Sequence, residues 1–261
     1  MNGNQASLFE TFEILGYFCK SKSKPMKKGQ FEFKQFTICH DKCAMKVGTD
    51  GVLLGAWTET EPDTRRILDI GTGSGLIAIM LAQKCNAEII GVDIDGEAIT
   101  QAQENGANSP WGERLHFLQT DILDYCPPTG FNLIVSNPPF FENALLCPDK
   151  KRTTARHSGN LPFDMLIEKA YTLLEEGGLF NVVLPVRTAD DFIHKAWERG
   201  LNLYRKSMVY TKPAAIPKRT LLSLKKGMSA YPQTTPIYIY KANNDYTDEY
   251  RKLTEDYYIH F

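Results

Sequence analysis

The sequence lacks a long apolar run, a C-x-x-C pair and any compositional bias. Its most apolar stretches, such as residues 76–82, are far shorter than the ~20 residues that a helix needs to cross a bilayer. Six cysteines are scattered through 261 residues, and the nearest approach to a metal motif, residues 39–43, has no second ligand pair. We therefore expect free thiols, no metal, no membrane span and a cytoplasmic location.

The N-terminus also lacks a secretory signal. The apolar patch at residues 14–19 is short, follows Glu10 and Glu13, and precedes lysines rather than trailing them. Five lysines between positions 20 and 28 surround Pro25, which predicts a flexible basic arm over residues 1–30, with Met26 as an alternative start. We expect residues 31–261 to form a single domain, because this length suits one large domain.

Charge is balanced overall, with 30 basic and 31 acidic side chains, but it is segregated along the chain. Residues 59–130 carry a net charge of −8, whereas residues 195–226 carry a net charge of +8. A basic segment hidden behind a neutral total is typical of proteins that bind an anionic polymer. A merely solvated lysine-rich surface gives the same count, so charge alone does not decide between the two.

Strand and helix patterns alternate from residue 66 onward. The predicted strands are Arg66–Ile70, 89–93, Leu115–Gln119, Phe131–Ser136 and 179–184, and the predicted helices are Leu76–Lys84, 97–105 and 163–175. This alternation predicts a doubly wound α/β domain with a mostly parallel sheet. Late strands at 204–210, 221–226 and 237–240 are expected to add antiparallel edge strands, and a short strand is predicted near residues 31–34.

A glycine-rich loop, Gly71-Thr72-Gly73-Ser74-Gly75, joins the first strand of this pattern to its helix. Glycines let the backbone approach a ligand closely, and a helix N-terminus offers unpaired N–H groups. Asp93 ends the next strand, 22 residues after Gly71, with Ile94 beside it. An acid there is placed to accept two ribose hydroxyls, so the loop predicts a site for an adenosine-containing cofactor.

The spacing discriminates between such cofactors. A dinucleotide fingerprint needs glycine at position 76, where this chain has Leu76. Asp69 precedes the loop, and an acid there would repel a pyrophosphate but suits the cationic amino-acid end of S-adenosylmethionine. Asp121 follows the third strand and is placed to accept the adenine amino hydrogen, while Ile122 covers the ring. A loop aspartate that caps a turn is the structural alternative for Asp121.

The motif Ser136-Asn137-Pro138-Pro139-Phe140 follows the fourth strand. Two prolines fix the backbone, so the Asn137 side-chain oxygen and the Pro138 carbonyl can form a rigid pair of acceptors. Such a pair can bind both hydrogens of a planar amine and free its lone pair for attack on a sulfonium methyl. Phe140 can stack on the acceptor base. A Pro-Pro turn alone is common, but behind this glycine loop it predicts a methyltransferase.

These motifs resemble those of the N6-adenine methyltransferases with an Asn-Pro-Pro-aromatic motif, and more closely the bacterial valine-tRNA adenosine-37 N6-methyltransferases. The resemblance runs from about residue 31 to 261 and includes residues 40–51, 53–57, 101–105 and 109–111. It implies a Rossmann-like class I S-adenosylmethionine-dependent methyltransferase that acts as a monomer on adenosine 37 of tRNA(Val). It also implies that residues 31–64 cover the cofactor. The residues that it places over the methionine end are Lys46, Gly48, Thr49 and Asp50.

Other acceptors stay open. The family usually has Tyr where this chain has Phe140, and Asn-Pro-Pro-Phe also resembles rRNA guanine-N2 methyltransferases, which continue with His rather than Phe141. Release-factor glutamine methyltransferases share the chemistry but resemble a design with a larger N-terminal helical domain. A non-catalytic RNA- or cofactor-binding module on the same fold is the remaining alternative, against which the intact acids and Asn137 argue.

The basic segment indicates where an RNA substrate would bind. Lys212, Lys218 and Arg219 flank a loop with prolines at both ends, residues 213–217. We expect these side chains to contact tRNA phosphates together with Lys225, Lys226 and the basic stretch 150–156, which includes Arg156.

Overall fold

The computed structural model describes residues 29–43, 45–139, 161–229 and 231–261. Most of the predicted basic arm, the stacking residue Phe140 and the RNA-binding candidate Arg156 therefore lie outside the described residues. The last two residues of the predicted arm belong to a hairpin instead: His40 N donates to Gly29 O, and strand β1 (Gln30–Glu32) pairs antiparallel with β2 (Thr37–Cys39).

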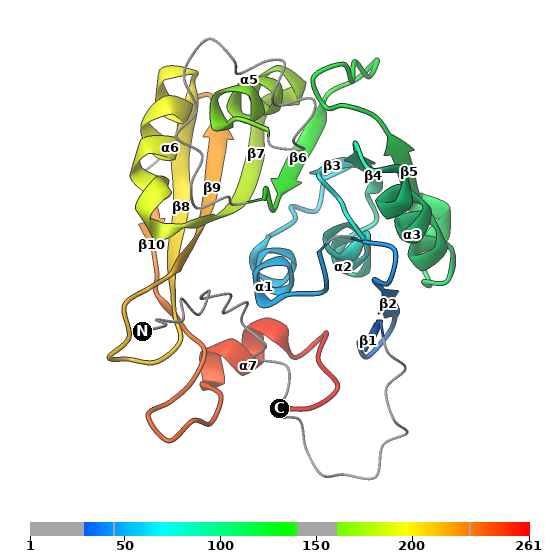
Figure 1. Ribbon diagram of the computed structural model, residues 1–261. Coiled ribbons are helices and arrows are strands. Elements are labelled where there is room, and N and C mark those ends of the chain that lie inside the picture. Colours follow the sequence, from blue (N-terminus) through cyan, green and yellow to red (C-terminus); the bar gives the residue numbers. More distant parts are fainter. Residues whose placement is uncertain (1–28, 44, 140–160, 230) are drawn as a thin grey trace, which may run out of the picture.

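A mixed nine-stranded sheet forms the centre of the described part of the chain (Figure 1). Its parallel strands are β3 (Arg66–Ile70), β4 (Glu88–Asp93), β5 (Leu115–Gln119), β6 (Phe131–Ser136) and β7 (Leu174–Pro185). One side is completed by β8 (Leu201–Tyr210), β9 (Arg219–Lys226), β10 (Gln233–Thr234) and β11 (Ile237–Tyr238).

The strand order places a ligand crevice at one edge of this sheet. The order is β10-β8-β9-β7-β6-β3-β4-β5, β11 also pairs with β8, and β9 runs antiparallel to both of its neighbours. From β3 the chain proceeds outward through β4 and β5, and then returns to the other side of β3 as β6. Doubly wound sheets bind ligands at such a switch point, beyond the C-terminal ends of the strands. The predicted fold class, including the antiparallel late strands, is confirmed.

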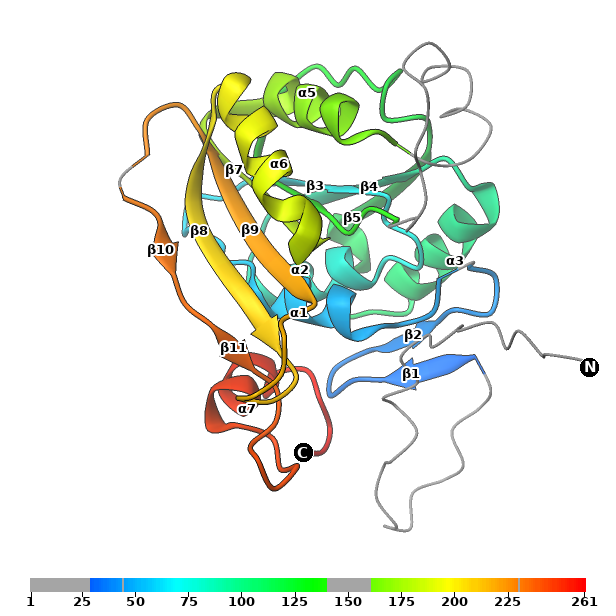
Figure 2. The same ribbon diagram turned by 60° about the vertical axis from the view of Figure 1, so that its left-hand side comes forward.

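Helices cover both faces of the sheet. Figure 2 shows α5 (Phe163–Leu173) and α6 (Val186–Glu198) on one face, with α1 (Thr49–Trp57), α2 (Leu76–Lys84) and α3 (Gly96–Ala107) on the other. Strand alternation divides the core accordingly, because successive side chains of a strand point to opposite faces. On β3, Ile67 packs in the cluster of α1 and α2, whereas Leu68 and Ile70 pack in the cluster of α5 and α6.

The sequence analysis missed two helices. In α1 every residue from Gly51 to Trp57 is buried, so the helix has no polar face for periodicity to reveal. It lies very close to α2, because a Cβ at Gly55 would come within 2.7 Å of Met80 Sδ. Helix α6 follows β7 directly at Pro185, without the turn residues that normally separate two elements. The helix predicted at 163–175 ends at Leu173, since Leu174 already pairs with Phe131.

The N-terminal hairpin and the C-terminal segment pack against each other. Phe33 stacks on Phe36 and on Tyr258, with ring centroids 4.6 and 6.2 Å apart. Lys34 N donates to Tyr257 O over 2.8 Å, and the Tyr257 hydroxyl donates to Met80 O on α2 over 3.1 Å. Helix α7 (Asp248–Thr254) and the turn η2 (Gly112–Arg114) complete the described elements. The C-terminal segment thereby holds the hairpin in place, and the chain continues from this hairpin toward the candidate site.

Within the four described ranges, no helix is long and apolar enough to cross a membrane. No group of three or more His, Cys, Asp or Glu side chains in that part of the chain is arranged to hold a metal ion. Four cysteines are free thiols, namely Cys39, Cys43, Cys85 and Cys126.

Candidate active site

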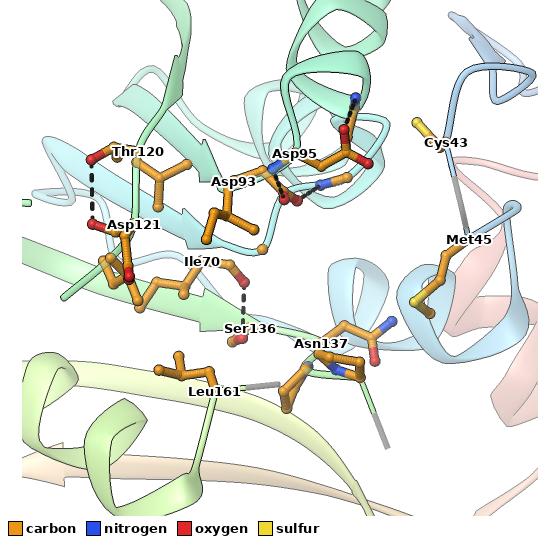
Figure 3. Close-up of a pocket in the computed structure, with 18 of the residues that line it drawn as sticks. Cys43, Met45, Ile70, Asp93, Asp95, Thr120, Asp121, Ser136, Asn137 and Leu161 are labelled. Carbon is orange, nitrogen blue, oxygen red and sulfur yellow. Dashed lines mark hydrogen bonds between the residues drawn. The ribbon is translucent and has the colours of Figure 1, made fainter. Parts of the chain in front are cut away.

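A cavity lies at the C-terminal ends of β3, β4, β5 and β6 (Figure 3). It brings together many of the predicted site residues: Gly71, Gly73, Asp93, Ile94, Asp121, Ile122, Asn137, Pro138 and Pro139. Figure 3 shows Asp121 at the left of the view, Asn137 lower and to its right, and Asp93 above them. Cys43, Met45 and Leu161 also line the cavity, and the sequence analysis did not single them out.

The glycine loop is shaped for close approach of a ligand. Gly71 and Gly73 adopt φ angles of 71° and 53°, in the left-handed region that favours glycine. A Cβ at either position would meet nothing within 4 Å, so both residues border open space on the cavity side. The amides of Gly71 and Thr72 both donate to Val92 O, over 2.9 and 3.0 Å, which pins the loop to β4. The glycine loop is therefore already shaped to hold a ligand, and we call it the glycine cradle.

Asp93 connects this cradle to the next strand. Its Oδ2 accepts from Gly73 N over 2.9 Å, and its Oδ1 accepts from Asp95 N over 3.0 Å. A carboxylate has about four acceptor sites, so it can accept two further hydroxyl donors from the cavity side. Asp95 in turn caps α3, since its Oδ1 accepts from Glu97 N over 2.9 Å.

Asp69 lies behind the glycine loop rather than in the cavity wall. It is fully buried, on the same face of β3 as Ile67, and Thr72 Oγ1 donates to its Oδ2 over 2.7 Å. Burial raises the pKa of Asp69 to about 7. Its contact with Thr72 makes it a support beneath the loop, which the sequence position alone did not reveal.

Asp121 caps a turn and also lines the cavity. Its Oδ1 accepts from Leu123 N over 2.9 Å, which caps the turn after β5. The residue also lines the cavity next to Ile122, so its second carboxylate oxygen is available to a ligand. Thr120 N donates to Asp93 O over 2.9 Å, which fixes this turn relative to the end of β4.

Asn137 presents a buried acceptor. Ser136 Oγ donates to Ile70 O over 2.9 Å, so the end of β6 is locked to the end of β3. The Asn137 Oδ1 atom that follows is buried and accepts no hydrogen bond from the described residues. Leaving a buried acceptor unpaired costs ~1–3 kcal/mol, so this oxygen suits a donor that a ligand brings. The first turn of α1 lies near the same carboxamide, because a Cβ added at Gly51 would lie 3.9 Å from Asn137 Nδ2.

Two side chains of α3 hold the segment that carries Cys43 and Met45. Asn105 accepts from Cys39 N (2.9 Å) and donates to both Cys39 O and Ser74 O (2.8 Å each). Gln101 Oε1 accepts from Lys42 N over 3.1 Å. Asn105 therefore joins the segment to the glycine loop. The signal in the sequence was two amides four positions apart on the inward face of a helix.

Besides Asp69, five predicted cofactor residues do not line the cavity within the described part of the chain: Lys46, Gly48, Thr49, Asp50 and Thr72. Lys46 and Gly48 are exposed before α1, and Thr49 and Asp50 form its half-buried first turn. Gly48 provides no side-chain cap for that turn. Asp50 Oδ2 accepts from Arg219 Nε over 2.7 Å.

The basic segment 195–226 does not form one basic face. Six of its nine basic residues pair with an acid: Lys195, Arg199, Arg205, Lys206, Arg219 and Lys226. Lys226 also donates to the Tyr171 and Leu174 carbonyls. Lys225 and Lys226 end β9, whereas Arg219 begins it, which separates them by roughly 20 Å. Lys225 and Lys226 therefore lie apart from Arg219, and their contact with tRNA phosphates stays a prediction.

The glycine cradle, the acids after successive strands and the Asn-Pro-Pro loop of a doubly wound sheet together define an S-adenosylmethionine-dependent methyltransferase. Comparisons with known proteins agree. Residues 45–195 match the family model described as the methyltransferase small domain. A predicted O-methyltransferase from Agrobacterium tumefaciens has a similar fold, with a TM-score of 0.63 and 18% identity over 80% of this chain and 96% of that one.

Similar proteins identify one family within the S-adenosylmethionine-dependent methyltransferases. The tRNA1(Val) (adenine(37)-N6)-methyltransferase of Bacteroides fragilis (strain YCH46) is 48% identical, over 90% of this chain and 99% of its own. Proteins of the same name from Phocaeicola vulgatus and Yersinia enterocolitica are 45% and 40% identical, over 90% and 92% of this chain and 99% and 97% of their own. The chain belongs to this family of tRNA1(Val) (adenine(37)-N6)-methyltransferases, within the methyltransferase small domain group.

Proposed function

We propose that this protein transfers a methyl group from S-adenosylmethionine to the exocyclic N6 amine of adenosine 37 in the anticodon loop of tRNA(Val). The observation that carries the proposal is the buried, unpaired Oδ1 of Asn137, on a double-proline loop at the rim of the cofactor cavity. The names of the relatives support the choice of this transfer RNA, of adenine as the base and of position 37.

The cavity fits the proposed cofactor. Gly71 and Gly73 leave open space for a ligand, Asp93 can accept the ribose hydroxyls, and Asp121 with Ile122 can hold the adenine. The resemblance supports placing Lys46, Gly48, Thr49 and Asp50 over the methionine end, and the uncapped first turn of α1 suits its carboxylate. When bound, the cofactor supplies an electrophilic methyl group on a sulfonium.

The residues of the chain orient the acceptor. The N6 amine of adenine is a poor nucleophile because its lone pair is delocalised into the ring. Asn137 Oδ1 and the Pro138 carbonyl accept its two hydrogens and draw the nitrogen toward tetrahedral geometry, which exposes the lone pair for in-line attack. Pro138 and Pro139 keep these acceptors in place without reorganisation. The proton leaves after transfer, so a strong base is not needed, and Phe140 stacks on the base.

The substrate adenosine reaches this pocket splayed out of the anticodon loop, since a stacked base would be inaccessible. Lys212 and Lys218, on the connection between β8 and β9, contact RNA phosphates together with Arg156. The same acceptor pair would serve a guanine N2 amine or a glutamine carboxamide, so the acceptor pair by itself does not select adenine. A cytoplasmic location follows from the transfer RNA substrate.

The variant Asn137→Ala tests the proposal. It removes the acceptor needed by the reacting amine, so we expect methyl transfer to tRNA to fall by ~10²-fold or more. Affinity for S-adenosylhomocysteine, measured by calorimetry, should change by less than about twofold, because the cradle and the acids are intact. Nucleoside analysis of labelled tRNA should give N6-methyladenosine with the wild-type enzyme. N2-methylguanosine, labelled protein, or full turnover by Asn137→Ala would each refute the proposal.

A further inference from the structure

An ion pair links strand β9 to helix α1, which lies beside the double-proline loop that carries Asn137. Arg219 Nε donates to Asp50 Oδ2 over 2.7 Å, and the two side chains are only 35% and 30% exposed. Arg219 opens β9, while Asp50 lies in the first turn of α1. The pair therefore joins a strand of the sheet to a helix that packs beside it.

The Asp50 side of the pair adjoins the reacting groups. The next residue, Gly51, is buried so tightly that a Cβ there would lie 3.1 Å from Leu76 Cδ2 and 3.9 Å from Asn137 Nδ2. The first turn of α1 thus lies close against α2, and Gly51 borders the space beside the Asn137 carboxamide. A shift of Asp50 would move Gly51 and so change the space in which the Asn137 side chain is held, because neighbouring groups in a packed interior do not move independently.

The Arg219 side of the pair has a rigid base. Its backbone is paired on both sides, with Pro185 of β7 and Val209 of β8. The preceding carbonyl, Lys218 O, accepts from Val186 N over 3.2 Å. A side chain held by such a frame positions its partner better than one on a loop. Arg219 also directly follows the connection to which we assign the RNA phosphates.

We propose that Arg219 is a positioning residue: its guanidinium holds Asp50, and through it the first turn of α1, against Asn137 in the acceptor site. This assignment rests on the proposed function. It gives Arg219 a role in turnover in place of the phosphate contact expected from the sequence. It also connects the RNA-contacting segment 211–218 to the acceptor loop.

A double-mutant cycle on the full-length enzyme tests this link. We expect Arg219→Gln and Asp50→Asn each to lower kcat at saturating substrates about tenfold, because Asn137 loses its orientation. The double variant should be no worse than either single one, since both changes break the same pair. Arg219→Lys should restore part of kcat. Additive losses in the cycle, or wild-type kcat in Arg219→Gln, would overturn the proposal.

The salt dependence of tRNA binding shows whether Arg219 positions Asp50 or instead contacts an RNA phosphate. Fluorescence anisotropy of labelled tRNA against KCl should give the wild-type slope for Arg219→Gln, whereas Lys218→Gln should lower the slope by about one. The matched control is Arg199→Gln, which breaks an exposed ion pair with Glu168 beyond the C-terminal end of α6. Its kcat should stay within about twofold of wild type, because α6 separates it from Val186 by roughly 20 Å. A reduced slope for Arg219→Gln would overturn the proposal.

Failure of the proposed function gives a different result. If the wild-type enzyme does not methylate tRNA, the proposed function is refuted whatever the variants do. The positioning role is then decided by affinity for S-adenosylhomocysteine, because Asp50, which Arg219 holds, lies in the segment that we place over the methionine end of the cofactor. Equal, several-fold losses in both single variants and the double variant support the link, and unchanged affinity in all three overturns it.

Discussion

Replacing Asn105 by alanine removes three buried hydrogen bonds, two to the Cys39 backbone and one to Ser74 O. At about 1 kcal/mol each, their loss should lower the free energy of unfolding by about 3 kcal/mol. The two bonds to Cys39 hold the segment that carries Cys43 and Met45 onto the cavity. Their ~2 kcal/mol sets an upper bound of about thirtyfold on the loss of cofactor affinity, and we expect between about threefold and thirtyfold.

Urea denaturation gives the free energy of unfolding, and calorimetry with S-adenosylhomocysteine gives the affinity. The matched control is Gln103→Ala on the same helix, where Nε2 donates only to Phe117 O over 3.1 Å. It should cost about 1 kcal/mol or less and leave the affinity unchanged. If Asn105→Ala does not fold, Gln101→Ala, which removes the bond from Lys42 N and the bond to Glu104 Oε2, should still weaken binding. Equal costs for Asn105→Ala and Gln103→Ala, or unchanged affinity, would refute the reasoning.

Two further changes test the support of the glycine loop. Because burial raises the pKa of Asp69 from 3.8 to about 7, its contribution to stability is present at low pH and lost as pH rises through the folded-state pKa. The free energy of unfolding of the wild type should fall relative to Asp69→Asn by roughly 2–3 kcal/mol between pH 5 and pH 7, and a constant difference in urea titrations would contradict this. Gly91→Ala would place a Cβ 2.6 Å from Phe117 Cδ1 and 2.7 Å from Thr72 Oγ1. It should cost about 1–3 kcal/mol, seen as a lower melting temperature, and an unchanged midpoint would count against the packing described.

The parallel strands could be predicted from the sequence because the patterns that mark them are local. The strands Arg66–Ile70, Leu115–Gln119 and Phe131–Ser136 have the predicted bounds, since apolar runs ended by glycine or polar turns mark buried strands. The C-terminal ends of parallel strands meet at one edge, so residues that follow successive strands converge without further information. Gly71, Asp93, Asp121 and Asn137 therefore line one cavity, as predicted.

Other features depend on packing between distant segments. Helix α1 escaped the sequence analysis because all of its residues from Gly51 to Trp57 are buried, so its apolar pattern has no helical period. Asp69 was expected to favour the cationic end of the cofactor, yet it lies behind the loop, because its place on β3 directs it toward Thr72. The role of Asn105 depended on where the hairpin docks, which is set by residues 66 positions away.

The sequence by itself determined the fold class, the cofactor and the reacting motif, because each is encoded in a short stretch whose geometry follows from backbone chemistry. Only the tertiary structure decided which charges meet. The net charge of +8 in residues 195–226 was compatible with a basic face and with a solvated lysine-rich surface, but most of those side chains pair with acids from other segments. Arg219 meets Asp50 because β9 and α1 pack at the same edge of the sheet. An ion pair depends on distance in space, and for side chains from different elements that distance cannot be read from their separation along the chain.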